Sequence, residues 1–117
     1  LHVSAGIATN VDFKVTPNAS QPFGVFSDLA NSIKKVVKIP VISVGRIHTP
    51  EVAEDILMQG KSDLVAIGRA LIADQNWAQK VATNNYDLIN QCLSCNHCIK
   101  AISRGDKLTC KVNNLLY

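Results

Sequence analysis

The stretch 39–74, IPVISVGRIHTPEVAEDILMQGKSDLVAIGRALIAD, contains the pattern that decides the fold. It holds two short runs rich in β-branched residues, 41–45 and 64–68, and each run ends in a glycine. Between the runs, Thr49 followed by Pro50 is typical of a helix start, because a hydroxyl caps the first turn and proline suits the first helical position. A strand, a helix and a strand with short connections predict a right-handed parallel βαβ unit with buried strands.

The same alternation continues on both sides of this unit. Apolar residues at helical spacing predict a helix over 26–37, and the apolar start at 1–4 indicates a further strand. Between them, 7–25 is an irregular segment rich in Pro, Asn and Ser, and loops of this length are often functional. Short helices are expected at 70–73 and 75–83. The chain is therefore predicted to be an α/β protein with a parallel sheet.

Composition narrows the classes of function. The chain has 117 residues and a net charge of +3, with its Lys and Arg scattered along the sequence, which argues against nucleic-acid binding. No apolar stretch approaches the roughly 20 residues of a membrane span, and no signal peptide is visible. We therefore expect a cytoplasmic protein that acts on small molecules and binds neither nucleic acid nor membrane.

Both predicted strands are followed by the same dipeptide, Gly45-Arg46 and Gly68-Arg69. In a (β/α)₈ barrel the loops after the last two strands commonly bind phosphate, helped by the start of a short extra helix. Glycine lets backbone N–H groups approach an anion, and arginine offers a fork of donors. Either pair alone is typical of a strand end with a surface arginine. Because the dipeptide occurs at equivalent positions of two neighbouring βα units, a shared anion site is as well supported as two unrelated strand ends.

All four cysteines lie in the last quarter of the chain, at Cys92, Cys95, Cys98 and Cys110. Such clustering indicates metal or redox chemistry in a reducing compartment. Four thiolates provide one ligand for each iron of a cubane iron–sulfur cluster, and the first three have the spacing of ferredoxin-type sites. The alternatives are a zinc site, in which His97 could compete as a ligand, and a structural or disulfide role.

Taken in order, the stretches 39–74, QCLSCNHCI (91–99) and GDKLTCKVN (105–113) resemble one known family. It is the NADH:flavin oxidoreductase or Old Yellow Enzyme group, in its branch of 2,4-dienoyl-CoA reductases and trimethylamine dehydrogenases. The resemblance covers nearly the whole chain and implies the C-terminal portion of a TIM (β/α)₈ barrel. On this basis 1–90 would be the last βα units of the FMN-binding barrel, and 91–117 a cysteine-rich [4Fe–4S]-binding segment.

The resemblance also implies roles for individual residues. The turns after the last two strands would bind the FMN phosphate through Gly45, Arg46, Gly68 and Arg69. The cluster ligands would be Cys92, Cys95, Cys98 and Cys110. Catalytic residues and flavin-ring contacts are expected in the first five βα units, and a dinucleotide-binding domain, with FAD as a further cofactor, after the barrel; both lie outside this chain.

The activity that the resemblance implies is NAD(P)H-dependent reduction of an activated alkene, such as a 2-enoyl or 2,4-dienoyl thioester, or the oxidation of an amine. NAD(P)H would be the electron donor, with FMN and a [4Fe–4S] cluster as the resident cofactors. The competing hypothesis is a fragment of a non-redox phosphate-binding barrel with a structural zinc site. A visible spectrum and a metal analysis distinguish the two.

Overall fold

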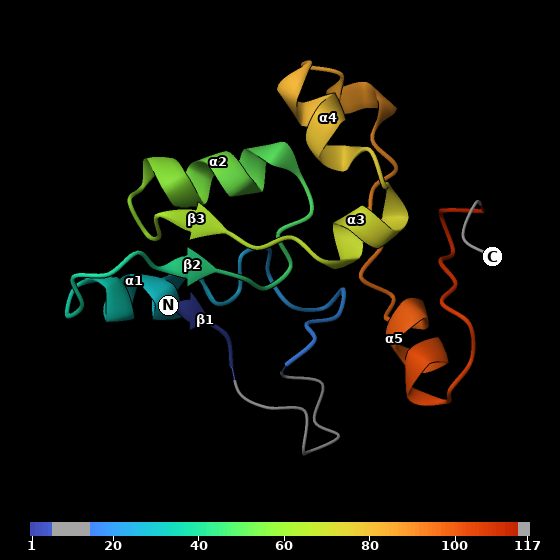
Figure 1. Ribbon diagram of the computed structural model, residues 1–117, viewed down its shortest axis with the longest axis horizontal. Helices are drawn as coiled ribbons and strands as arrows, with labels where there is room; N and C mark the ends of the chain where they lie inside the picture. The colour runs from blue at the N-terminus through green and yellow to red at the C-terminus, as the bar shows by residue number, and fades with distance from the viewer. Residues whose placement is uncertain (6–14, 115–117) are drawn as a thin grey trace. The chain divides into compact units, whose positions relative to one another are not determined.

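The computed structural model describes residues 1–5 and 15–114 of the chain. These residues form two compact units, Leu1–Ile67 and Gly68–Tyr117, which are described one at a time (Figure 1). The first part of the predicted loop, 7–14, lies outside the described residues. The boundary predicted from the sequence, after residue 90, separates the barrel part from the cysteine-rich segment. The compact units are instead divided after Ile67, so the predicted boundary stays a prediction.

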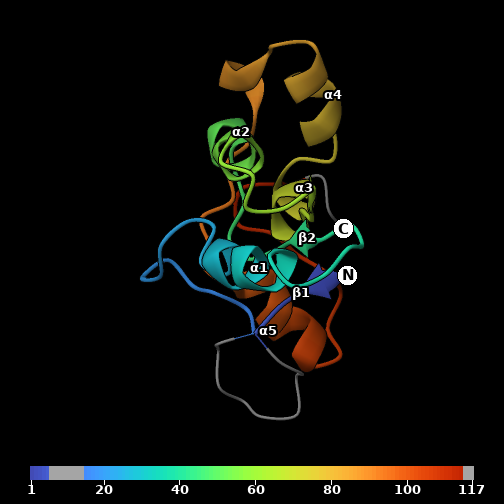
Figure 2. The ribbon, with the colours of Figure 1, turned by 90° about the vertical axis from the view of Figure 1, so that its left-hand side faces the viewer.

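The first unit is built on a parallel sheet with the strand order β1-β2-β3. Figure 2 shows both of its helices on the same side of the strands. In chain order the elements are β1 (His2–Val3), α1 (Ser27–Lys34), β2 (Ile42–Ser43), α2 (Pro50–Met58) and β3 (Leu64–Val65). The parallel pairing of β2 with β3 across α2 confirms the predicted βαβ unit.

Two apolar clusters join the helices to one face of the sheet. The first consists of Val3, Ala30 and Val41, and the second of Ile47, Ala53 and Ile56. The neighbouring register row, His2, Ile42 and Leu64, alternates with Val3 and Val65 and therefore lies on the other face. There the side chain of Leu64 is 53% exposed. This row, with the apolar side chains of Ile42 and Leu64, is open in the described chain, which agrees with the closed barrel that the resemblance implies.

Two polar contacts fix the ends of these elements. The Thr49 hydroxyl accepts a hydrogen bond from the Val52 N–H at 3.4 Å, which confirms the predicted capping of α2. The carboxylate of Asp63 accepts hydrogen bonds from Lys34 Nζ at 2.7 Å and from the Val41 N–H at 2.8 Å. Asp63 therefore ties the end of α1 to the segment that enters β2.

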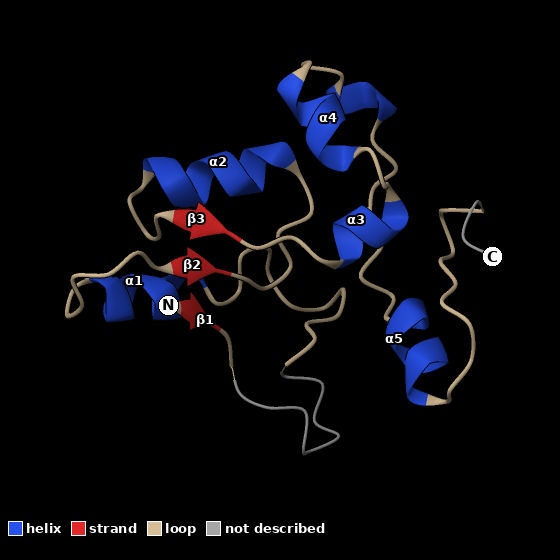
Figure 3. Ribbon diagram, viewed as in Figure 1, coloured by secondary structure: helices blue, strands red, loops and turns tan. Residues whose placement is uncertain are grey.

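The second unit consists of short helices joined by loops, which Figure 3 separates by colour. The elements are α3 (Arg69–Ala73), α4 (Trp77–Ala82), the 3₁₀ helix η1 (Tyr86–Leu88) and α5 (His97–Ser103). The first two confirm the helices predicted from periodicity. Within the described parts of the chain, every helix is too short or too polar to span a bilayer.

The periodicity of the sequence predicts no helix after residue 83, so the sequence analysis missed α5. This helix buries Cys98 and Ala101, which are three residues apart. Its other apolar side chains are less buried, because Ile99 is half-buried and Ile102 is 53% exposed. A single buried pair in seven residues is too short a pattern for helical periodicity to be recognised.

We expect the 117-residue chain, expressed alone, to self-associate through the open face and edges of its sheet. Leu64→Lys should shift it toward the monomer in sedimentation velocity, because the charge falls on the open apolar row. Met58→Lys is the matched control and should not, since Met58 ends α2 with its side chain 82% exposed. A chain that stays monomeric at all concentrations, or that responds equally to both substitutions, would contradict this interpretation.

Candidate functional site

The chain bends at Gly45 and Arg46, shortly after β2. Both residues have positive φ angles, 114° and 54°. A Cβ atom at Gly45 would lie 2.5 Å from the Phe26 ring, so both the conformation and the packing require glycine there. Arg46 adopts a left-handed conformation that is strained for a residue with a side chain, and such strain is concentrated at functional sites. Packing of Phe26 thus fixes the turn that carries Arg46.

The half-buried side chain of Arg46 is held by the segment that precedes α1. Its Nη1 donates a hydrogen bond to the carbonyl oxygen of Gln21. Its guanidinium carbon lies 4.2 Å from the centroid of the Phe23 ring, a distance typical of a cation–π contact. The predicted phosphate-binding arginine is therefore held by contacts with Gln21 and Phe23.

Gly68 differs from Gly45 in its surroundings. Its φ angle is −114°, which any residue can adopt. Within the described part of the chain, and apart from the residues next to it in sequence, no residue places an atom within 4 Å of a Cβ built at Gly68. Neither conformation nor packing of these residues requires glycine, so the space beside the backbone is left open. Close approach of a ligand to the backbone needs such a space.

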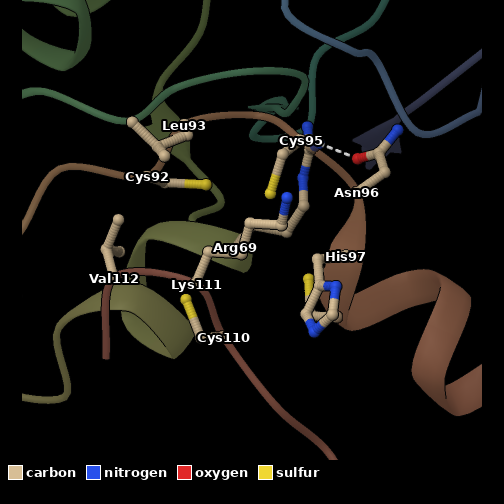
Figure 4. A pocket seen from close by; sticks show the side chains of 10 residues that line it. Arg69, Cys92, Leu93, Cys95, Asn96, His97, Cys110, Lys111 and Val112 are labelled. Carbon is tan, nitrogen blue, oxygen red and sulfur yellow. Dashed lines mark hydrogen bonds between the residues drawn. The ribbon is translucent and has the colours of Figure 1, made fainter. Parts of the chain in front are cut away.

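The second unit brings Arg69 and all four cysteines to one pocket, which is shown in Figure 4. Arg69 begins α3, and its side chain crosses the middle of the pocket. The sulfur atoms of Cys92, Cys95 and Cys110 are directed toward it. Cys98, on α5, is buried and completes the set of thiols in the pocket lining. All four cysteines of the predicted cluster site therefore lie in the lining of one pocket, and their ligation of a metal stays a prediction.

Two left-handed residues shape the loop that carries the first three cysteines. Ser94 and Asn96, on either side of Cys95, have φ angles of 51° and 56° and are 1% and 4% exposed. Two reversals separated by one residue turn the backbone around the pocket. The spacing did not reveal them, although asparagine is one of the few side chains that tolerate this conformation readily.

Hydrogen bonds fasten both cysteine-bearing segments to α3. The Arg69 Nη1 donates to Asn96 Oδ1 in the first segment. In the second, Asn113 Nδ2 donates to the carbonyl oxygen of Ile72 at 3.0 Å. His97, the competing metal ligand considered from the sequence, instead has its Nε2 3.1 Å from the Thr109 hydroxyl. Both cysteine-bearing segments of the pocket are thus fixed to α3.

Burial raises the pKa of the Cys92 and Cys98 thiols, although the positive charge of Arg69 and backbone N–H donors oppose that increase. Metal ligation requires the thiolates, so loading the pocket would release protons. Among residues 1–5 and 15–114, no three Cys, His, Asp or Glu side chains are gathered closely enough to hold a single metal ion.

Asp74, next to the end of α3, anchors the chain that leads to the first cysteine. Its side chain is 4% exposed and pairs with Lys80 Nζ at 2.5 Å. It also accepts hydrogen bonds from the N–H groups of Asn76 at 3.0 Å and Asn90 at 2.9 Å. Burial acts to raise the pKa of Asp74, but the hydrogen bonds from Lys80 and these N–H groups outweigh it and lower the pKa. Sequence analysis gave this residue no role.

The predicted site residues are divided between the two units. Gly45 and Arg46 lie in Leu1–Ile67, and Gly68, Arg69 and the cysteines lie in the other unit. The structure places Arg69 in the lining of the same pocket as the four thiols. Convergence of the two Gly-Arg turns on one phosphate stays a prediction.

Comparison with known proteins supports the resemblance seen in the sequence. A profile of the NADH:flavin oxidoreductase / NADH oxidase family matches residues 5–87. The chain is 45% identical over 116 residues to an NADH oxidase of Thermoanaerobacter brockii, covering 97% of this chain and 18% of that protein. It is 35% identical over 98 residues to a cinnamate reductase of Clostridium sporogenes, covering 83% and 15%.

A solved structure shares the fold of the chain. The 6-hydroxypseudooxynicotine amine oxidase of Pseudomonas geniculata N1 superimposes with a TM-score of 0.88 at 23% identity, covering 98% of this chain and 17% of that one. The α/β chain is accordingly a piece of a TIM-barrel-type fold. It spans less than a fifth of the length of each of these relatives.

Substitution by alanine should have a large effect on stability at Gly45 and a small one at Gly68. Gly45→Ala should lower the free energy of unfolding by about 2–4 kcal/mol, because it combines a disallowed φ angle with a clash against Phe26. Gly68→Ala should change it by less than about 1 kcal/mol, since its φ is ordinary and its Cβ would meet open space. Urea unfolding measures both, and equal losses would contradict this account of the turns.

Asp74→Asn should lower the free energy of unfolding at pH 7 by about 1–3 kcal/mol, because it leaves Lys80 without its buried carboxylate. The pKa of Asp74 is lowered in the folded state, so its contribution is complete above the unfolded pKa of about 3.9. That contribution is lost as the pH falls through the lower folded value.

The difference between wild type and Asp74→Asn should therefore shrink on acidification below about pH 4. Asp87→Asn is the matched control, because Asp87 is exposed on η1. Unfolding curves recorded between pH 7 and pH 3 provide the measurement. If the difference in free energy of unfolding between wild type and Asp74→Asn grew toward low pH, the predicted direction of the pH dependence would be wrong.

Proposed function

Because the chain belongs to the NADH:flavin oxidoreductase / NADH oxidase family, we propose that it is the C-terminal barrel part of an FMN- and [4Fe–4S]-dependent oxidoreductase. One observation carries the proposal: Arg69, the predicted phosphate ligand, lines the pocket that holds all four cysteines. Residues predicted to serve two different cofactors thus lie within one small unit. A phosphate-binding barrel with an unrelated zinc site gives no reason for that proximity.

The residues present fit a flavin phosphate. Arginine forms bidentate hydrogen bonds with phosphate oxygens, and each of the two turns supplies one. Contacts with Gln21 and Phe23 hold Arg46, and the bond to Asn96 orients Arg69. The open space beside Gly68 would admit a phosphate oxygen to the backbone. FMN would supply the hydride-transfer chemistry, and these residues would bind and orient it.

The four thiols also fit an iron–sulfur cluster. The four thiols share the lining of one pocket. A cubane cluster takes one thiolate for each of its four irons, which matches the number of cysteines in the pocket. In our proposal Cys92, Cys95, Cys98 and Cys110 hold it, and Arg69 offsets its negative charge.

For the reaction, we favour NAD(P)H-dependent reduction of an activated alkene. The relatives named NADH oxidase and cinnamate reductase support a nicotinamide donor and a conjugated acceptor. A 2-enoyl or 2,4-dienoyl thioester has the same activated double bond. The catalytic proton donor and the contacts to the flavin ring would come from other parts of the barrel. A substrate screen must also include amines, because amine oxidation is the other reaction that the resemblance implies.

We expect the complete enzyme, purified without oxygen, to contain one FMN and about four irons with equal sulfide for each chain. Its visible spectrum should show flavin bands over a broad iron–sulfur absorption. Cys98→Ser should remove most of the iron, because it deletes one of the four thiolates, and Ser103→Ala on the same helix should not. A colourless protein with one zinc for each chain would exclude this function and favour the structural-zinc alternative.

A further inference from the structure

The loop 21–24 contacts Arg46 at three points. The carbonyl oxygen of Gln21 accepts a hydrogen bond from the guanidinium. The ring of Phe23 lies under the guanidinium carbon, with 4.2 Å between that carbon and the ring centroid. The N–H of Gly24 donates to the carbonyl oxygen of Arg46 at 3.3 Å. Both ends of the arginine, its backbone and its charged group, are therefore held by one short loop.

Packing in the core does not account for Phe23. Its side chain is 50% exposed, and it belongs to neither apolar cluster of the described residues. Its aromatic contacts are instead with polar groups: the guanidinium of Arg46 and the ring of His48. The His48 ring, which is 3% exposed, meets it edge to face with a centroid distance of 6.2 Å and an interplanar angle of 76°. Phe23 is therefore placed between a buried histidine and an arginine.

The backbone of the loop is itself fixed. Gly24 has a φ angle of 62°, and a Cβ there would lie 3.1 Å from Ile56 Cδ1 on α2. The carbonyl oxygen of Gly24 accepts a hydrogen bond from the Ser27 N–H at 2.7 Å, at the start of α1. The ring of Phe23 is thus carried on a segment joined to both helices. It can serve as a rigid support for a long, flexible side chain.

We propose that Phe23 is a positioning residue that presents the guanidinium of Arg46 to the phosphate of the flavin. A ring under the face of a guanidinium restrains its rotation and engages the face and not the edge that carries the N–H donors. Restraint before binding reduces the entropy that is lost when a phosphate is bound. This inference rests on the proposed role of Arg46 in flavin binding and adds to it a residue that does not touch the phosphate.

The test is the affinity of the complete apoenzyme for FMN and for riboflavin, which lacks the phosphate. Phe23→Leu keeps an apolar side chain and removes the aromatic face, so it should raise the Kd of FMN about 3- to 30-fold. The Kd of riboflavin should stay within about twofold. Phe23→Tyr keeps the ring and should restore wild-type affinity for FMN. In an Arg46→Gln background, Phe23→Leu should have no further effect on FMN binding.

The outcomes separate this inference from the proposed function. If Arg46→Gln weakens FMN selectively while Phe23→Leu does not, arginine binds the phosphate and the role of Phe23 is wrong. An equal loss of FMN and riboflavin in Phe23→Leu, or a loss that Phe23→Tyr shares, would also overturn it, because the residue would then be structural or a flavin-ring contact. If Arg46→Gln leaves the preference for FMN over riboflavin unchanged, the phosphate site itself is misassigned.

Discussion

The hydrogen bond from Arg69 to Asn96 is the interaction on which the cysteine pocket depends. It joins the first residue of α3 to the loop that carries three of the four thiols, at a residue whose left-handed backbone already bends that loop. Asn113 fastens the segment of the fourth thiol to the same helix. These two bonds give cysteines from two separate segments a common frame. The pocket is therefore a property of α3 as much as of the cysteine spacing.

This arrangement gives arginine two different structural tasks in one chain. Arg69 lies among the thiols, where its charge favours the deprotonated forms of Cys92 and Cys98 against the effect of burial on their pKa. Arg46 lies over an aromatic ring and is held by a loop that packs on two helices. In both cases a neighbouring side chain or carbonyl oxygen restrains the guanidinium. Ordered arginines after consecutive strands are what a barrel needs to bind an anionic cofactor without a large entropic loss.

The sequence predicted the elements whose signals are local. The β-branched runs gave the strands, Thr49 with Pro50 gave the start of α2, and the cysteine spacing gave the common pocket. It did not predict α5, because one buried pair of residues is too short a pattern. The Phe23–Arg46 contact and the bond from Asn113 join residues distant in the chain, so no local pattern encodes them. The same applies to Asp74, whose role depends on burial.

The central claim is that the four thiols ligate an iron–sulfur cluster beside Arg69. Anomalous diffraction from crystals of the complete enzyme, recorded above the iron and the zinc absorption edges, tests it most directly. We predict strong iron density enclosed by Cys92, Cys95, Cys98 and Cys110, with no anomalous signal specific to zinc. A single compact peak that appears only above the zinc edge, or thiols without any metal in protein purified and crystallised anaerobically, would contradict the account.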